Sequence, residues 1–400
     1  MGAADALSTP ALEALARRRL PRPIADFIAG GAGEESALRG NEDAFRTLRW
    51  VPRSFEACVK RRTSVRVLDQ DFDSPFGVSP MGLGELAWPG TDQALMTMAA
   101  ERRIPYVLST AASTTLEQCA RWCDGQAWFQ IYPVADVDTT RQLLRRAQDC
   151  GIRHLVFTVD AAHPGRRLRD RRSGFGRSLW THPASVFSYA THPAWTTQTL
   201  RAGIPRMVNL AGLKSAGQTP SSPQTLIASM AQAELTWDTL RRVRDHWPHF
   251  LVVKGVLDPD IAVPLRSAGV DAIQLSNHGA RQLGSAISPV WVVEAFRQAL
   301  GPDYPLFLDS GVRSGEDVAK ALSLGMDLVF LGRSWLYATA SMAPHQGARL
   351  AAHLLQAELD SAMAQTGCAD VAGLRRVRIV REGWLIDARE TAASPAVNTH

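Results

Sequence analysis

A histidine and an arginine stand three residues apart at His278 and Arg281, just after a short apolar run. Histidine has the side-chain pKa closest to neutrality, so it can take up a proton at physiological pH. The guanidinium of arginine stays charged and grips a carboxylate through two parallel hydrogen bonds. The pair therefore predicts proton transfer on a small carboxylate substrate. The same spacing also occurs where ordinary surface helices begin, so the rest of the chain has to decide between the two interpretations.

Composition and charge limit the class of protein. Four hundred residues, 46% of them hydrophobic and 21% charged, supply a large core. No run of about eighteen uncharged apolar residues occurs and no secretory signal is recognisable, so we expect a cytoplasmic protein that is at most peripheral to a membrane. The five scattered cysteines predict reduced structural thiols and no metal site. A net charge of +5 on dispersed arginines disfavours nucleic acid and suits small anions.

Short apolar runs recur along the chain, and a helical pattern follows each. Alternating strands and helices indicate parallel pairing, and continuous apolar runs indicate strands buried on both faces. Eight such units predict an α/β fold, a (β/α)8 TIM barrel. The runs are residues 76–81, 106–110, 127–132, 154–160, 250–256, 272–277, 305–310 and 328–333.

We expect a single barrel domain over residues 1–390 and a disordered tail over 391–400. Residues 11–29 predict an N-terminal helical segment that divides at Pro21 and Pro23, and residues 348–365 predict a helix that closes the barrel. A long insertion follows the fourth strand. Its residues 174–233 contain no Asp or Glu and combine basic with aromatic side chains, among them Trp195. This composition suits an anionic membrane surface, an active-site lid or a subunit contact.

In a barrel of this kind the active site lies at the carboxyl ends of the strands. The sequence places a lysine, a histidine and three arginines there, and strand ends that merely meet solvent do not readily explain that set. The loops after the last two strands predict a phosphate cradle. There Gly311 and Gly332 let the backbone approach an anion, while Arg313 and Arg333 supply charge.

Five motifs in the order of the chain resemble the FMN-dependent 2-hydroxy-acid oxidases and dehydrogenases. They are WFQIY at 128–132, TVD at 158–160, VKG at 253–255, SNHGARQL at 276–283 and DSGVR at 309–313. The resemblance covers roughly residues 10–385. Within the family it is strongest to the bacterial (S)-mandelate dehydrogenase branch, in which an insertion at this place binds the membrane.

The resemblance implies a role for each motif residue. His278 would be the base, Asp160 would hold the imidazolium, Tyr132 would bind the substrate oxygen, and Lys254 would stabilise the reduced flavin. Arg281 and Arg167 would clamp the substrate carboxylate. The FMN cofactor would be bound by Pro80, Met81, Gly82, Ser109, Gln130, Thr158, Lys254, Ser276, Asp309, Gly311, Arg313, Gly332 and Arg333. A homotetramer is implied as well.

Two positions depart from the family pattern. Phe27 stands where most members carry a tyrosine that donates to the substrate carboxylate, and Ala280 replaces the usual glycine in a tight turn. Phe27, together with Met81, Leu83 and Trp88 after the first strand, predicts an apolar side-chain pocket. We therefore expect an aryl or bulky, mandelate-like 2-hydroxy acid to be the substrate.

The motifs leave several alternatives open. Electrons could pass to a quinone-type acceptor, or to oxygen in an oxidase that produces hydrogen peroxide. A flavin-binding barrel without turnover would have no reason to keep His278, Arg281 and Lys254 together. A sugar-phosphate isomerase barrel would keep the phosphate loops and lack the pair of His278 and Arg281.

Overall fold

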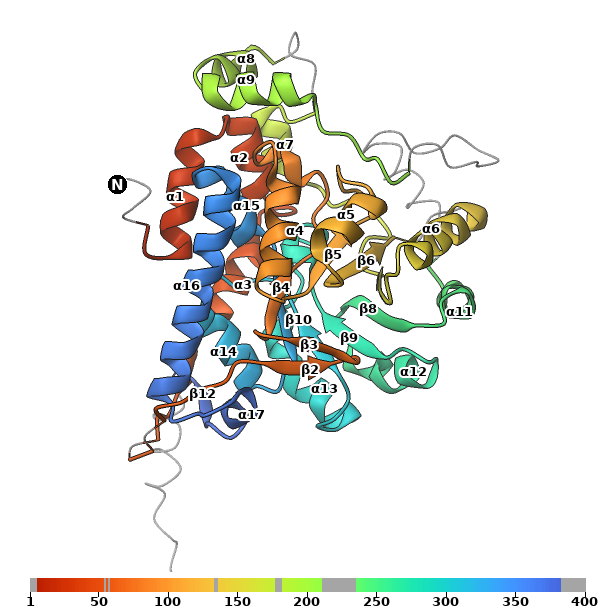
Figure 1. The fold of residues 1–400 in the computed structure, drawn as a ribbon, viewed down its shortest axis with the longest axis vertical. Helices are drawn as coiled ribbons and strands as arrows, with labels where there is room; N and C mark the ends of the chain where they lie inside the picture. The colour runs from red at the N-terminus through yellow and green to blue at the C-terminus, as the bar shows by residue number, and fades with distance from the viewer. Residues whose placement is uncertain are drawn as a thin grey trace, which may run out of the picture.

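The computed structural model describes residues 6–382 except 54, 57, 133–135, 177–181 and 211–234. At its centre eight parallel strands form a closed barrel in the order β10-β11-β4-β5-β6-β7-β8-β9 (Figure 1). The strands are β4 (Phe76–Val78), β5 (Tyr106–Ser109), β6 (Ala127–Ile131), β7 (His154–Thr158), β8 (Phe250–Val256), β9 (Ala272–Leu275), β10 (Leu306–Leu308) and β11 (Leu328–Leu331). The predicted TIM barrel is confirmed. All strands except β8 end before the predicted run does, because the polar residues that follow turn away into the rim loops.

The strands are apolar throughout because both of their faces are buried. Along β5, Val107 points into the barrel, whereas Tyr106 and Leu108 pack outward beneath the helices. Trp128 and Phe307 also fill the interior, with their ring centroids 5.8 Å apart. Side chains alternate across a strand, so each strand contributes to an inner and an outer core.

Helices cover the outside of the barrel. They are α4 (Thr91–Glu101), α5 (Leu116–Cys123), α6 (Val137–Asp149), α11 (Trp237–His246), α12 (Ala262–Ser267), α13 (Val293–Leu300), α14 (Gly315–Ser323), α15 (Arg333–Ser341) and α16 (Pro344–Gln365). The predicted helix 348–365 is α16. It begins four residues earlier than expected, because Pro344 occupies a first-turn position in which a missing N–H costs nothing.

A hairpin of β2 (Val65–Val67) and β3 (Gln70–Phe72) covers the amino-terminal end of the barrel. Phe72 packs against Trp128 inside it, and the indole N–H of Trp128 donates to Oε1 of Gln70 at 2.9 Å. Strand β1 (Leu48–Trp50) pairs with β12 (Ile379–Arg381), and the short helix α17 (Val371–Leu374) precedes β12. With this end closed, access to the interior lies at the carboxyl ends of the strands.

The N-terminal segment forms α1 (Thr9–Arg19), α2 (Arg22–Ala29) and α3 (Ser36–Arg46). The break between α1 and α2 falls at Pro21, as predicted, whereas Pro23 lies in the first turn of α2 and does not divide the segment. Helix α1 packs on α15 beside α16 (Figure 1). Helix α2 ends at the rim of the barrel, where its last carbonyl groups face the site described below.

The insertion after β7 contains α7 (Leu168–Ser173), α8 (Pro183–Ala190) and α9 (Pro193–Ala202). Helices α8 and α9 lie at one end of the molecule, over α2 (Figure 1). Trp195 anchors α9 by donating its indole N–H to the carbonyl of Leu86 at 3.0 Å, so this aromatic side chain faces inward. Residues 177–181 and 211–234 of this region, and the predicted tail 391–400, lie outside the described residues.

Close helix packing makes one glycine indispensable for stability. A Cβ at Gly347 on α16 would collide with the carbonyl oxygen of Ala338 on α15, whereas a Cβ at Gly40 on α3 would meet nothing within 4 Å. We expect Gly347→Ala to lower the free energy of unfolding by about 1–3 kcal/mol through overpacking. Gly40→Ala should raise it by about 0.5–1 kcal/mol, because alanine favours a helix interior. Denaturant unfolding of both variants tests this, and equal stability of the two would contradict it.

Candidate active site

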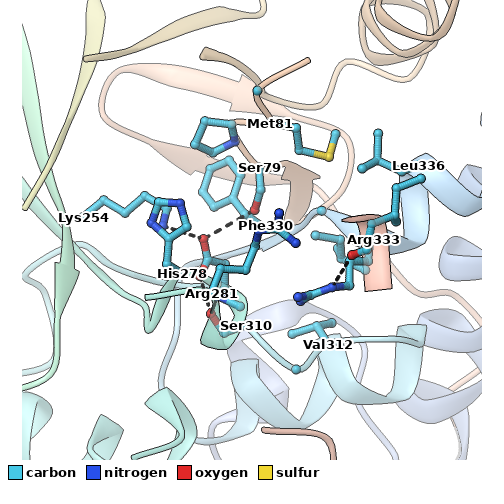
Figure 2. A pocket seen from close by; sticks show the side chains of 18 of the residues that line it. Ser79, Met81, Lys254, His278, Arg281, Ser310, Val312, Phe330, Arg333 and Leu336 are labelled. Atoms are coloured by element: carbon cyan, nitrogen blue, oxygen red, sulfur yellow. Dashed lines mark hydrogen bonds and ion pairs between the residues drawn. The ribbon is translucent and has the colours of Figure 1, made fainter. Parts of the chain in front are cut away.

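Two adjoining cavities open at the carboxyl ends of the strands. The first encloses about 880 Å³, part of it open to solvent, within the range of cofactor sites. Lys254 and His278 lie at one end of it and Arg333 at the other (Figure 2). Among the predicted cofactor residues, those that line it are Pro80, Met81, Gly82, Thr158, Lys254, Asp309, Gly311, Arg313, Gly332 and Arg333.

The second cavity encloses about 940 Å³ and is mostly apolar. Leu83, Ala111, Phe175 and Met207 line it together with the charged Arg167. Its wall shares five residues with the first cavity, namely Phe27, Gly82, Tyr132, His278 and Arg281. Four predicted catalytic or substrate residues therefore stand where the two cavities meet, which is where a bound cofactor would meet a substrate.

His278 is held by a buried carboxylate. Its Nδ1 lies 2.8 Å from Oδ1 of Asp160, while Oδ2 of Asp160 is buried with no hydrogen-bond partner among the described residues. Burial alone would raise the pKa of Asp160, but the charges of His278 and Lys254 outweigh it and lower the pKa. Asp160 is therefore ionised at neutral pH and accepts the Nδ1 hydrogen. With Nδ1 held in this way, Nε2 is the ring nitrogen that faces away from Asp160 and could accept a proton.

Glycine 255 makes room for that carboxylate. A Cβ at this position would lie 2.6 Å from Cβ and Cγ of Asp160, and the backbone has a φ of +100° that strongly favours glycine. Within the VKG motif, Lys254 thus lines the first cavity, and Gly255 leaves the space in which Asp160 lies next to the histidine.

Lys254 lies in a fully buried polar network. Its Nζ donates to Oγ of Ser276 at 2.7 Å and lies 3.2 Å from Oδ2 of Asp309, which also accepts from Nε2 of Gln274 at 3.0 Å. Ser276 supports the neighbouring turn as well, since its Oγ accepts from the N–H of His278 at 3.0 Å. Ser276 lies behind the cavity wall, where it fixes the lysine and the histidine relative to each other.

Ser109, Gln130 and Thr158 form a second buried chain. Ser109 donates its hydroxyl hydrogen to Oε1 of Gln130 at 3.1 Å, and Nε2 of Gln130 donates to the hydroxyl of Thr158 at 2.9 Å. Only Thr158 of these three lines the first cavity. Ser109 and Gln130 therefore do not line the cavity themselves, and they are connected to it by the hydrogen bond from Gln130 to Thr158.

Two half-buried guanidinium groups have no carboxylate partner among the described residues. Arg281 donates to the carbonyls of Phe27 and Gly30 at 2.7 and 3.0 Å, and Arg333 donates to those of Ile28 and Gly30, both at 2.9 Å. Burial, and then repulsion from neighbouring arginines, lowers the pKa of Arg281 to about 9 and that of Arg333 to about 10. Both remain charged at neutral pH, and an anion in the cavities would relieve their mutual repulsion.

The two predicted phosphate loops differ in what they offer an anion. At the start of α14 the N–H groups of Arg313 and Ser314 donate to Oδ2 of Asp317, and that of Gly315 donates to Glu358. The N-terminus of α14 is thus occupied by carboxylates of the chain itself. Among the described residues, no side chain caps α15 after Gly332. An open helix N-terminus is therefore available to an anion at α15, beside Arg333, but not at α14.

Arg313 and Gly311 complete this end of the cavity. Arg313 pairs with Glu42 at 3.0 Å, so its charge is partly compensated. Gly311 has a φ of +92°, and a Cβ there would collide with the carbonyl oxygen of Asn41. The glycine is required because the loop passes directly over α3.

An aromatic wall separates the arginines from the insertion. The ring of Phe27 stacks on Phe175, with centroids 4.2 Å apart, and the guanidinium carbon of Arg281 lies 4.9 Å above its centre. Nε of Arg167 lies 3.6 Å from Oδ2 of Asp170, and Arg167 also borders the second cavity. Tyr132 faces both cavities, and burial, assisted by the charge of Asp160, raises the pKa of its phenol. The phenol thus stays protonated and can donate a hydrogen bond.

The lining of the second cavity differs from the sequence prediction in three respects. Trp88 does not line it, because this side chain is 2% exposed in a separate core cluster with its ring under Arg19. Met81, which we also predicted for this pocket, lines the first cavity instead. Phe175 and Met207 do line it, and we did not predict them. They come from the long insertion, whose acid-free composition indicated a surface or lid but did not indicate which side chains point inward.

Comparison with known proteins places the chain among flavoenzymes. Residues 16–381 match the family described as FMN-dependent dehydrogenase. The chain is 35% identical to (S)-mandelate dehydrogenase of Pseudomonas putida, covering 92% of each chain, and 32% identical to L-lactate dehydrogenase of Pseudomonas paraeruginosa, covering 92% and 97%. The crystal structure of the monotopic membrane protein (S)-mandelate dehydrogenase superposes with a TM-score of 0.85 at 33% identity, covering 94% of this chain and 99% of that one.

Proposed function

The chain belongs to the FMN-dependent dehydrogenase family, and from this premise we propose that it oxidises an aryl 2-hydroxy acid to the 2-oxo acid with His278 as the base. The observation that carries the proposal is the junction of the two cavities. There a histidine paired with a carboxylate and a half-buried arginine without a carboxylate partner among the described residues face the same space. A base and a carboxylate clamp side by side are what the oxidation of a 2-hydroxy acid requires.

The first cavity has the chemistry that FMN needs. The buried amine of Lys254 would lie at the end where the ring binds, with Pro80, Met81 and Thr158 around it, and Asp309 would bind the ribityl chain. Gly311, Arg313, Gly332 and Arg333 would hold the phosphate, with the open N-terminus of α15 as the main anion site. When bound, FMN supplies the acceptor for the two electrons that leave the substrate.

Oxidation of the hydroxy acid releases two electrons and two protons. Nε2 of His278 would take one proton, because Asp160 already holds the hydrogen on Nδ1, and the second proton would leave the substrate with the two electrons that bound FMN accepts. The ionised Asp160 then stabilises the imidazolium that forms. Arg281 and Arg167 would orient the carboxylate, and the phenol of Tyr132 would donate to the oxygen that becomes the ketone.

We expect His278→Gln to slow anaerobic bleaching of the flavin by mandelate about 100-fold or more, because it removes the base. The variant should still contain FMN, since the groups at the phosphate end of the cavity are untouched. His353→Gln on α16 is the matched control, because its exposed side chain lies outside both cavities and should leave the rate unchanged. Bleaching of the His278 variant at a rate within about tenfold of the parent would identify another group as the base.

The lining of the second cavity supports an aryl substrate. Phe27 and Phe175 present stacked rings, and Leu83 and Met207 add apolar surface. Phe27 also lacks the hydroxyl that most family members direct at the carboxylate. A ring on the substrate would gain apolar burial here, whereas the methyl group of lactate would leave much of the cavity unfilled.

We expect kcat/KM for mandelate to exceed that for lactate, and Phe175→Ala to lower the mandelate value about tenfold while changing the lactate value little. Phe27→Tyr should lower KM for both acids, because a hydroxyl adds a charge-assisted hydrogen bond of about 1.5–3 kcal/mol to the shared carboxylate. Steady-state kinetics of the two variants with both acids tests this. A parent enzyme that prefers lactate would contradict the proposed substrate class.

The outer face of α8 and α9 supports a membrane contact. Phe187 is 73% exposed, and Leu200 and Ile204, in and after α9, are similarly exposed beside the basic Arg201 and Arg206. Apolar side chains flanked by arginines suit the surface of an anionic bilayer. Among the described helices, none combines the length and apolar character that crossing a bilayer requires. We propose that the protein binds the membrane peripherally and that a quinone-type acceptor takes the electrons. Rapid formation of hydrogen peroxide in air would instead favour the oxidase alternative.

Binding to vesicles tests this surface. We expect the protein to sediment with vesicles that contain phosphatidylglycerol, and more weakly as the salt concentration rises. The triple variant Phe187→Ser, Leu200→Ser, Ile204→Ser should remain in the supernatant and keep its activity. A control with Val137→Ser and Val263→Ser replaces exposed apolar side chains on α6 and α12 and should still sediment. Equal sedimentation of both variants would exclude the α8–α9 face as the membrane contact.

A further inference from the structure

Two buried asparagines face each other beneath the turn that carries His278. Asn41 on α3 is 1% exposed and Asn277 is 4% exposed. Nδ2 of Asn41 donates to Oδ1 of Asn277 at 2.9 Å, and Nδ2 of Asn277 donates to Oδ1 of Asn41 at 2.6 Å. The two amides thus form a closed pair of hydrogen bonds between residues 236 positions apart in the sequence.

The surroundings fix the orientation of both amides. Nδ2 of Asn277 also donates to the carbonyl of Ile287 at 3.1 Å, and its Oδ1 accepts from the N–H of Ala280 at 3.0 Å. Turning the Asn277 amide over would place its NH2 group against the donors of Asn41 and Ala280. Its oxygen would then face the oxygens of Asn41 and Ile287, so all four hydrogen bonds would be lost. The side chain of Asn277 therefore makes four hydrogen bonds, two of them to Asn41.

The turn that Asn277 supports is conformationally unfavourable. His278, Gly279 and Ala280 have φ values of +58°, +61° and +61°. A Cβ disfavours this left-handed region, so only Gly279 adopts it freely. A sequence with alanine in place of the usual family glycine depends more on outside contacts to hold the turn.

We infer that Asn41 is a positioning residue for His278. Asn41 holds Asn277 in place, and Asn277 in turn holds the left-handed turn 278–280 in the conformation in which His278 contacts Asp160. This inference rests on the proposed role of His278 as the base. Arg281 follows the turn, but its guanidinium is held separately by the carbonyls of Phe27 and Gly30. Loss of the clamp should therefore impair proton transfer more than substrate binding.

Asn41→Ala tests the inference against a stability control in the same helix. Phe45→Leu removes buried volume from α3 without touching the turn, since Phe45 belongs to the core cluster of the barrel. For Asn41→Ala we expect anaerobic flavin bleaching by mandelate to slow about tenfold, with KM changed less than about threefold. In the flavin-free protein, hydrogen exchange at the amides of residues 279–281 should accelerate. Phe45→Leu should leave the rate and the exchange near those of the parent.

Rescue provides the sharper measurement. Ala280→Gly lowers the conformational cost of the turn at residue 280. The double variant Asn41→Ala, Ala280→Gly should therefore bleach at least about threefold faster than Asn41→Ala alone. Should Asn41→Ala fold poorly, the isosteric Asn41→Asp serves in its place, because one carboxylate oxygen would face Oδ1 of Asn277 with no hydrogen between them. The inference would be overturned if Asn41→Ala and Ala280→Gly changed the bleaching rate independently of each other. It would also be overturned if Asn41→Ala and Phe45→Leu lowered the rate equally. His278→Gln in the same assay reports on the proposed base separately.

Discussion

The rim of the barrel depends on how two half-buried guanidinium groups are compensated. Withdrawing a charge from water is unfavourable, and neither Arg281 nor Arg333 has a carboxylate partner among the described residues. Their partners are the carbonyls of Phe27, Ile28 and Gly30. Helix α2 ends at Ala29, and the last carbonyls of a helix have no partner within it. The negative end of the helix dipole therefore faces both arginines.

This form of compensation leaves the positive charge of both arginines available to an anion. A carboxylate partner would neutralise the charge and compete with any incoming anion, as Asp317 and Glu358 do at the N-terminus of α14. Partial charges of the main chain hold the guanidinium groups in place without cancelling them. The same helix end positions Phe27 under Arg281, so α2 sets both the geometry of the aromatic wall and the charge beside the two cavities.

The sequence allowed the barrel and most of the rim to be predicted, because the strands are local apolar runs and the carboxyl ends of parallel strands meet at one edge. The resemblance pointed to His278, Asp160 and Lys254, and the structure brings these three together. Contacts between distant segments were not predictable. Phe175 and Met207 reach the second cavity from the insertion, Trp88 turns away from it, and the carboxylates at α14 close one of two similar loops. None of these outcomes leaves a periodic signal in the sequence.

The contact between α2 and Arg333 joins residues 305 positions apart. Contacts between such distant residues close a very long loop of chain, and they form late in folding because the entropy of that closure is lost before the contact is made. The carbonyls of α2 can therefore reach Arg333 only after synthesis has passed α15, as is also true of the pairing of β4 with β11 that closes the barrel. A ligand that needs both arginines then binds only the finished chain, so its binding free energy adds to the stability of the native state and not to that of a half-assembled barrel.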